Sequence, residues 1–286
     1  MQGRTWVALG DPVGAEGQYP ELIRRFLERS SDYGGVPVFY EVGRRHLHRY
    51  ADFGLTFVKL GEEAQVDLTG LGLQGGRAAR FRQVVRRLEK DGGVFRMIHP
   101  AEAPAILDQL RAVSDDWLAA RATAEKGFSL GFFDPEYVSR APVAVIERAG
   151  RILAFATIWP GPTGEELSMD LMRYHRDAPR SAMEALCVHV MLWGHLHGYT
   201  RFGLGMAPLS GFENSAVASL WNRLGGFLYH HADSVYHFQG LRAWKDKFDP
   251  IWEPRYLVYP GGLRLPRIMA DVSALIAGGY RQIFRK

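Results

Sequence analysis

Charged side chains stand inside an otherwise apolar segment near the middle of the chain. In residues 168–173 (SMDLMR), a strand would place Ser168, Asp170 and Met172 on one face and end at Arg173. A charge buried in a strand is costly unless it is paired. Two interpretations remain open here: a structural pair between Asp170 and Arg173, or a charged site in a cleft.

A second group of charges lies in residues 240–250. Arg242, Lys245 and Asp249 follow an i, i+3, i+7 spacing, so one face of a helix can carry all three. The Lys245 ammonium group suits a phosphate or an oxyanion, and a buried lysine can lose its proton and act as a base. The alternative interpretation is a solvated basic helix.

Two glycine-rich segments complete the candidate site. Residues 205–211 (GMAPLSG) follow a predicted strand and precede a predicted helix, where backbone N–H groups can hold an anion or a carbonyl oxygen. Residues 125–131 (EKGFSLG) and 133–137 (FDPEY) form a turn-rich loop that ends at Tyr137. Loops rich in glycine and aromatic residues often line binding sites.

Motifs for nucleotide, metal and covalent chemistry are absent from the sequence. There is no Walker loop, and the glycine pair at 203 and 205 lacks the third glycine of a dinucleotide fingerprint. The histidines at 195, 197, 230 and 231 lack ligand partners at metal-site spacing, and Cys187 lies in an apolar helix. We therefore expect a transferase or a binding protein that uses no cofactor and no metal.

Composition and charge are those of a folded soluble protein. The 286 residues are 47% hydrophobic and 23% charged, with a single cysteine and a net charge of +4. They predict one large domain or two moderate ones in a reducing, cytoplasmic setting. No apolar stretch reaches the roughly 18 residues of a membrane span. Basic zones at 72–100 and from 239 onward suit RNA phosphates or an anionic membrane, or are solvated helix faces.

Strands and helices alternate along the chain, which predicts an α/β or α+β fold. A hairpin is expected to turn at residues 149–150, and Ser181 with Glu184 predicts a capping box at a helix start. A loose helix–strand–helix–strand repeat suggests two duplicated domains, joined by a linker at 100–104. Helices are expected over 19–30, 44–53, 76–91, 105–124, 181–197, 214–224, 241–248 and 265–276. Strands are expected over 5–9, 36–40, 55–60, 65–68, 142–147, 151–159, 166–172, 200–206, 227–229 and 252–259.

Several of these segments together resemble one family, the bacterial aminoacyl-phosphatidylglycerol synthases that transfer lysine or alanine. The resemblance runs from about Trp6 to Tyr259 and covers the family's C-terminal catalytic part. It rests on residues 10–14 (GDPVG), 39–42 (FYEV), 59–64 (KLGEEA), 66–68 (VDL), 125–131, 168–173, 204–211 (LGMAPLSG) and 240–248 (GLRAWKDKF).

The resemblance implies an α/β fold of tandem acetyltransferase-like (GNAT) domains with mixed central sheets flanked by helices. Residues 1–100 would form an N-terminally incomplete first domain, and 101–286 a second domain with most catalytic residues. It implies transfer of a lysyl or alanyl group from aminoacyl-tRNA to phosphatidylglycerol through a tunnel. The transfer would change membrane surface charge and give resistance to cationic antimicrobial peptides. The expected setting is the cytoplasmic face of the bacterial inner membrane, beside an N-terminal transmembrane flippase domain.

The same resemblance implies roles for individual residues. Asp170, Arg173 and Lys245 are the expected catalytic residues: Asp170 would hold the α-ammonium group, Arg173 would orient Asp170 or a phosphate, and Lys245 would assist the hydroxyl or the oxyanion. Substrate contacts are expected from Tyr137, Ser168, Arg242, Met206 and Ser210, and tRNA contacts from Arg77, Arg80, Arg86 and Arg87. Membrane contacts are expected from Arg264, Arg267, Arg281, Arg285 and Lys286.

Three alternatives remain at this point. One is a related aminoacyl-tRNA-dependent transferase with a soluble acceptor, of the peptidoglycan-bridge type. Another is an acetyl-CoA-dependent acetyltransferase, which would need a pyrophosphate loop that residues 173–181 lack. The third is a non-catalytic fragment that binds tRNA or a membrane.

Overall fold

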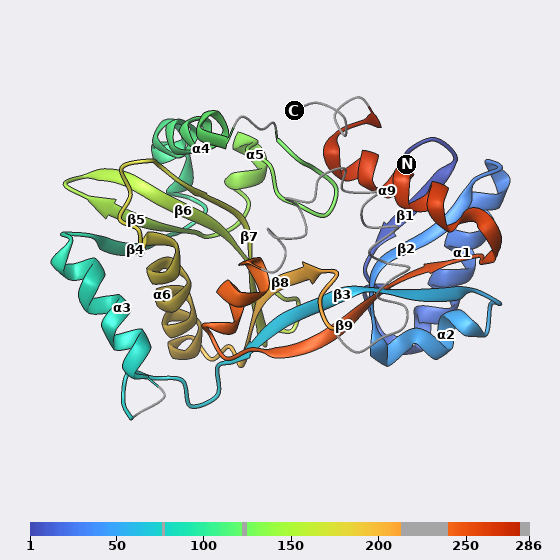
Figure 1. Ribbon diagram of the computed structural model, residues 1–286, viewed down its shortest axis with the longest axis horizontal. Helices are drawn as coiled ribbons and strands as arrows, with labels where there is room; N and C mark the ends of the chain where they lie inside the picture. The colour runs from blue at the N-terminus through green and yellow to red at the C-terminus, as the bar shows by residue number, and fades with distance from the viewer. Residues whose placement is uncertain (76–77, 122–124, 213–239, 281–286) are drawn as a thin grey trace. The chain divides into compact units, whose positions relative to one another are not determined.

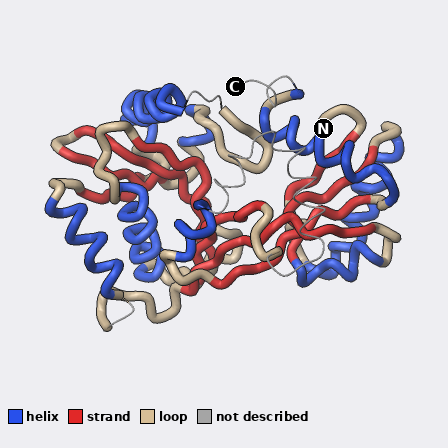
Figure 2. The backbone as a smooth tube through the Cα atoms, viewed as in Figure 1, coloured by secondary structure: helices blue, strands red, loops and turns tan. Residues whose placement is uncertain are grey.

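The computed structural model describes residues 1–75, 78–121, 125–212 and 240–280. The chain forms two compact units, each assembled from separate stretches of sequence (Figures 1 and 2). The first unit comprises Met1–Ala64, Lys126–Ser129 and Met206–Arg285, and the second is built from Gln65–Glu125 and Leu130–Gly205. These units do not follow the expected boundary at residue 100, because the C-terminal strand returns to the N-terminal sheet. The division into two acetyltransferase-like domains stays a prediction.

The first unit is a four-strand sheet of order β1-β2-β9-β3 with helices on both faces. Strand β1 (Thr5–Leu9) pairs in parallel with β2 (Val36–Gly43), and β2 pairs antiparallel with β9 (Ile251–Tyr259). Strand β3 (Thr56–Asp67) follows β9 in the order. The helices are α1 (Tyr19–Asp32), α2 (Leu47–Ala51) and α9 (Leu265–Ala277), with single turns η1 (Glu16–Gln18), η2 (Arg44–His46) and η4 (Gly262–Arg264).

A β-bulge in β2 sets which side chains of this strand reach which core. Val38 and Tyr40 pack with residues of α9, whereas Phe39 and Val42 pack with Ile23 of α1. Strict alternation would place Val42 on the same face as Tyr40. The pairing register with β9 shifts between Phe39 and Val42, and this extra residue turns Val42 to the α1 face.

The second unit has a sheet of order β8-β7-β6-β5-β4. Strands β4 (Val94–Ile98), β5 (Val143–Arg148), β6 (Arg151–Pro160) and β7 (Glu166–Tyr174) pair antiparallel, and β8 (Arg201–Pro208) pairs in parallel with β7. The helices are α3 (Ala79–Lys90), α4 (Leu107–Arg121), α5 (Pro135–Val138) and α6 (Ala182–Leu196), with the turn η3 (Ala103–Ile106).

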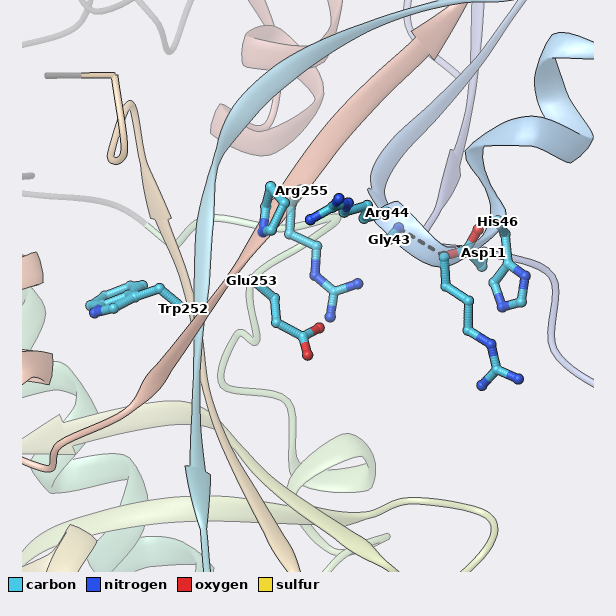
Figure 3. A pocket seen from close by; sticks show the side chains of 9 residues that line it. Asp11, Gly43, Arg44, His46, Trp252, Glu253 and Arg255 are labelled. Atoms are coloured by element: carbon cyan, nitrogen blue, oxygen red, sulfur yellow. Dashed lines mark hydrogen bonds between the residues drawn. The ribbon is translucent and has the colours of Figure 1, made fainter. Parts of the chain in front are cut away.

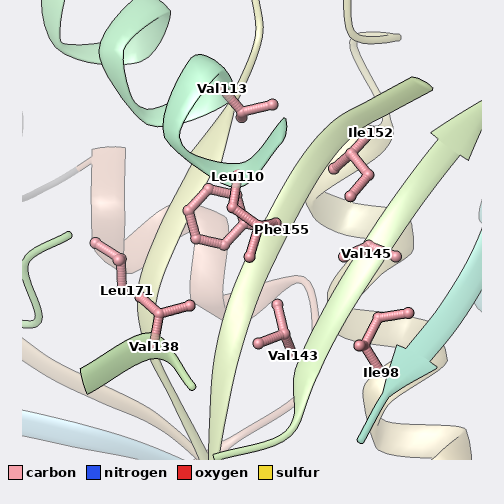
Figure 4. Packing of buried hydrophobic residues seen from close by; sticks show 9 residues of the cluster. All are labelled: Ile98, Leu110, Val113, Val138, Val143, Val145, Ile152, Phe155 and Leu171. Atoms are coloured by element: carbon pink, nitrogen blue, oxygen red, sulfur yellow. The ribbon is translucent and has the colours of Figure 1, made fainter. Parts of the chain in front are cut away.

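The core of the second unit lies between α4 and the strands β5 to β7. Phe155, Leu110 and Val143 are fully buried in it, and Figure 4 shows them packed together. The predicted hairpin is confirmed: Arg148 pairs with Arg151, and Ala149 and Gly150 take φ values of 51° and 77°, as a tight hairpin turn requires.

Mixed α/β architecture and most expected elements are confirmed. The helices over 19–30, 76–91, 105–124, 181–197 and 265–276 correspond to α1, α3, α4, α6 and α9. Residues 240–246 are helical as expected, and 44–53 divide into η2 and α2. The helix expected over 214–224 and the strand over 227–229 lie outside the described residues.

Two local expectations are wrong. Residues 55–60 and 65–68 are not two strands, because β3 runs unbroken through the acidic residues between them. The capping box at Ser181 does not form: Glu184 pairs with Arg80 at 3.1 Å, and the buried Ser181 hydroxyl has no hydrogen-bond partner among the described residues. Sequence analysis also missed β4, which precedes the expected linker.

No helix in the described part of the chain combines the length and apolar character that crossing a lipid bilayer requires.

Replacing Phe155 by alanine tests the core of the second unit. The ring is fully buried, so Phe155→Ala should lower the free energy of unfolding by about 3–5 kcal/mol. Urea denaturation followed by circular dichroism measures this. Leu196→Ala is the control, because that side chain is 80% exposed and its loss should change stability by less than about 0.5 kcal/mol. Equal stability of the two variants would contradict the packing described.

Candidate functional site

Asp170 lies at a second β-bulge, in β7 of the second unit. Ala156 of β6 pairs with Met172, but Ile158 pairs with Met169, so β7 carries one extra residue between them. Ser168 and Met172 therefore fall on opposite faces, and the expectation that they share a face is wrong. The bulge is held by the Leu171 N–H, which donates to the Thr157 hydroxyl at 3.1 Å.

The Asp170 carboxylate accepts two hydrogen bonds from the loop and short helix beside it. Gly131 N–H donates to one oxygen at 2.8 Å, and the Tyr137 hydroxyl donates to the other. A Cβ at position 131 would collide with the Asp170 carboxylate, so this approach requires glycine. Burial raises the pKa of Tyr137, and the hydrogen bond to Asp170 adds to it, which keeps the phenol protonated as a donor.

Aromatic rings pack around Tyr137, the residue whose hydroxyl donates to this carboxylate. The Tyr137 ring lies 5.7 Å from Phe132 and 5.4 Å from Trp159, centroid to centroid. The Asp134 side chain caps α5 by accepting from Tyr137 N–H at 2.9 Å, which fixes the tyrosine backbone. A carboxylate with remaining lone pairs is suited to a cationic ligand such as an ammonium group.

Arg173 pairs with Glu125 rather than with Asp170. Its guanidinium donates to Glu125 at 2.9 Å and lies 4.1 Å from the centre of the Trp117 ring. Burial lowers the pKa of Arg173, and Glu125 opposes that effect. Glu125 also accepts from Phe133 N–H at 3.2 Å, so Arg173 anchors the loop that carries Gly131. The structural pair expected between Asp170 and Arg173 is therefore wrong, because the ionic partner of Arg173 is Glu125.

In the first unit, Lys245 and Arg242 are both held by hydrogen bonds to neighbouring segments. Lys245 is 3% exposed and its ammonium donates to the Met206 carbonyl at 2.9 Å. Arg242 donates to Glu62 at 2.6 Å and lies 4.2 Å from the centre of the Trp252 ring. Asp249 follows the end of the helix at 246 with a φ of 54°, so the expectation that it shares their helix face is wrong.

The 206–211 segment is tied to β3 by its own side chain. The buried Ser210 hydroxyl donates to the Ala207 carbonyl at 2.8 Å and accepts from Glu62 N–H at 3.0 Å. Lys59 donates to the Gly211 carbonyl at 2.9 Å and to Glu62 at 2.8 Å. Burial alone would raise the pKa of Glu62, but hydrogen bonds from Lys59 and Arg242 bring it below its usual value.

Sequence reasoning missed a second acidic group beside this one. Glu63 of β3 accepts from the Arg255 Nε of β9 at 2.7 Å. Glu41 occupies the β2 bulge with a φ of 67°, and its pKa is raised to about 7, first by burial and then by Glu63. The sequence does mark Glu41 as unusual, because it is a charged residue inside the apolar run 39–42 (FYEV). Asp170 stands out in residues 168–173 for the same reason.

A cavity of 640 Å³ opens at the end of β2 in the first unit (Figure 3). Asp11 at its edge accepts from Gly43 N–H at 2.8 Å and from the Tyr50 hydroxyl at 3.0 Å. Among the described residues, the lining includes none of the predicted site residues. It consists of Asp11, Gly43, Arg44, Arg45, His46, Trp252, Glu253, Pro254 and Arg255.

The expected tRNA-binding arginines lie on α3, apart from Arg77, which falls outside the described residues. Arg86 and Arg87 are exposed, whereas Arg80 is held by Glu184. Arg264 and Arg267 are exposed near the start of α9; residues 281, 285 and 286 are not described. Over the described ranges, no three His, Cys, Asp or Glu side chains are grouped to hold a metal ion.

Comparison with known proteins gives a consistent picture. Residues 1–259 match the family model described as "Phosphatidylglycerol lysyltransferase, C-terminal". A phosphatidylglycerol lysyltransferase of Bacillus subtilis is 40% identical over 275 residues, which cover 96% of this chain and 32% of that protein. One from Staphylococcus aureus is 37% identical over 88% of this chain and 30% of its own length. The chain thus spans about a third of the length of these curated relatives.

Solved structures agree with the sequence relatives. The C-terminal domain of a putative lysylphosphatidylglycerol synthetase from Agrobacterium fabrum is 43% identical, with a TM-score of 0.87 over 98% of this chain and 85% of that one. L-PGS from Bacillus licheniformis is 40% identical, with a TM-score of 0.81 over 96% and 83%. FemX, at 8% identity and a TM-score of 0.55 over 91% and 81%, shares the fold alone.

Neutralising Glu62 tests the network on β3. Because the folded-state pKa of Glu62 lies below its usual value of 4.5, its stabilisation is present above that pH and is lost as pH falls through the folded-state pKa. Glu62→Gln should therefore destabilise the protein by about 2 kcal/mol at neutral pH, and by progressively less in acid. Denaturant unfolding at several pH values measures the difference. Glu28→Gln on α1, 55% exposed, is the control; a loss independent of pH would contradict this account.

Proposed function

The chain belongs to the phosphatidylglycerol lysyltransferase C-terminal family, and on that premise we propose that it transfers a lysyl group from aminoacyl-tRNA to the glycerol headgroup of phosphatidylglycerol. The observation that carries the proposal within the structure is the Asp170 carboxylate, held by Gly131 and by Tyr137, whose ring packs against Phe132 and Trp159. That arrangement supports recognition of the ammonium group of an aminoacyl ester.

The chemistry needs little beyond positioning and charge stabilisation. An aminoacyl ester on tRNA is already activated, so a lipid hydroxyl can attack its carbonyl carbon directly. The reaction then requires correct orientation, removal of one proton and stabilisation of an oxyanion. Asp170 would hold the α-ammonium group, with Tyr137 and Ser168 beside it. Lys245 would stabilise the developing negative charge.

Other residues act through their neighbours in this proposal. Arg173 is a positioning residue, because its bond to Glu125 anchors the loop that carries Gly131. Arg242 and Ser210 both bond to Glu62, so they shape the lining of the first unit around Lys245. Met206 contributes the carbonyl that fixes the Lys245 ammonium.

Two surfaces would serve the macromolecular partners. The exposed Arg86 and Arg87 of α3, with Arg80 and Arg77, would contact tRNA phosphates. Arg264 and Arg267 would face the anionic membrane, at the cytoplasmic face of the inner membrane. The longer relatives leave room for an N-terminal membrane domain, proposed here to be a flippase.

The names of the relatives favour the lipid acceptor over the alternatives. Relatives at 37% to 40% identity are phosphatidylglycerol lysyltransferases, whereas the likeness to FemX is a likeness of fold alone. A transfer assay with liposomes distinguishes the lipid reaction from transfer to a soluble acceptor and from binding without catalysis.

Asp170→Asn tests the proposal directly. Purified protein is mixed with phosphatidylglycerol liposomes and lysyl-tRNA carrying labelled lysine, and label is followed into the lipid phase. The variant should lose about 100-fold in kcat/KM, because an amide cannot neutralise the buried ammonium. Asp115→Asn on α4, an exposed position, should behave as the wild type. Label appearing only in a soluble acceptor, or in none, would refute the lipid reaction.

Arg86→Gln combined with Arg87→Gln tests the tRNA surface. Removing two positive charges that face phosphates should raise KM for aminoacyl-tRNA and leave kcat unchanged. The slope of log affinity against log salt should fall by about 0.7–0.9 for each phosphate that is no longer neutralised. Filter binding over a range of salt concentrations measures the slope. Arg24→Gln with Arg25→Gln on α1 is the matched control, and an unchanged slope in the α3 variant would rule out this surface.

A further inference from the structure

Glu41 combines an unusual backbone conformation with an unusual electrostatic setting, and the proposed function uses neither. We infer that Glu41 is the general base that takes the proton from the attacking hydroxyl group. The inference rests on the transfer reaction proposed above and adds a catalytic residue to it. Two observations support it: the bulge in β2 that holds Glu41 at a positive φ, and the charged groups of three other elements that act on its side chain.

The backbone places a glutamate where glycine would be easier. A φ of 67° at Glu41 lies in the left-handed region, which disfavours a residue with a long side chain. Such residues persist where the surrounding structure enforces them, and they cluster at functional sites. Here the bulge between Phe39 and Val42 enforces the conformation, because it delivers Val42 to the core facing α1. The bulge leaves Glu41 as the extra residue and re-aims its side chain.

Charged groups from three elements surround the Glu41 carboxyl group. Glu63 of β3 acts on it as a like charge, and Arg255 of β9, which is bonded to Glu63, acts on it as an opposite charge. Lys245, from the helical segment 240–246, adds a second positive charge, and Tyr40 on its own strand donates a hydrogen bond. The residue as a whole is partly exposed.

Glu41 and Glu62 differ in acid strength because their surroundings differ. Burial, followed by Glu63, raises the pKa of Glu41 to about 7. Glu62, bonded to Lys59 and Arg242, has its pKa lowered instead. A base that titrates near neutral pH combines availability with a useful proton affinity.

The proposed step balances. The hydroxyl O–H bond breaks and its proton passes to the Glu41 carboxylate, while the oxygen bonds to the ester carbonyl carbon. The carbonyl π electrons move onto oxygen, where the Lys245 ammonium stabilises the charge. Collapse of this intermediate expels the ribose oxygen of tRNA, which takes the proton back from Glu41. The products are the lipid ester and free tRNA, and Glu41 is a carboxylate again.

The test is the pH dependence of kcat in the liposome assay, between about pH 5 and about pH 9. Wild-type kcat should rise with pH and level off with an apparent pKa of about 7. Glu41→Gln should lower kcat about 10²–10⁴-fold with little change in KM. It should also abolish the rise of kcat with pH on the acidic side of the profile, which is the acidic limb. Glu63→Gln should move that limb to lower pH, because it removes the like charge and leaves Arg255 facing Glu41.

Two further variants separate catalysis from folding. Glu41→Gly suits the left-handed backbone, so its melting temperature should equal or exceed that of the wild type while kcat is lost. Glu28→Gln on α1 should leave both the rate and the pH profile unchanged. Wild-type kcat in Glu41→Gln, or an acidic limb that Glu63→Gln does not move, would overturn the assignment of Glu41. A wild-type protein that labels no lipid would overturn the proposed function, and the inference with it.

Discussion

Two adjacent carboxylates on β3 organise the first unit. Glu62 and Glu63 are consecutive residues of a strand, so their side chains leave opposite faces of the sheet. Each is met by an arginine from the C-terminal part of the chain: Arg242 bonds to Glu62 and Arg255 to Glu63. Both carboxylates are partly buried, and pairing offsets the cost of removing their charge from water. These two pairs let β3 run unbroken and fix β9 and the 240–246 helix against the N-terminal strands.

The consequences of this pairing reach the candidate chemistry. Because Glu62 also accepts from Lys59 and donates its backbone N–H to Ser210, the 206–211 segment is held in one conformation. That segment supplies the Met206 carbonyl that holds the Lys245 ammonium. Glu63, on the other face, is the like charge that helps to keep a proton on Glu41. A single acidic dipeptide therefore helps to position the lysine and adds to the effect of burial on the pKa of Glu41.

The two units use the same device to present an acidic side chain. Glu41 sits at a bulge of β2, and Asp170 sits at a bulge of β7. A bulge adds one residue to a strand and turns the side chains that follow to the other face. Each unit thereby presents a carboxylate from the middle of a strand whose neighbours are committed to a core.

The sequence by itself determined the features that depend on near neighbours. Helical periodicity placed α1, α3 and α9, and Gly150 marked a hairpin because glycine readily takes the positive φ of a tight turn. A charged residue inside an apolar segment identified Asp170 as a candidate site residue. The same pattern occurs at Glu41 in residues 39–42.

Only the tertiary structure decided which partners these residues have. Arg173 pairs with Glu125, 48 positions away, and Arg255 with Glu63, 192 positions away. The registers of β2 and β7 depend on the strands beside them, so neither bulge is visible in a single strand's pattern. The acid strength of Glu41 follows from burial and from charges on three other elements. Such properties arise only when distant segments pack together, because burial and charge proximity are set by the fold.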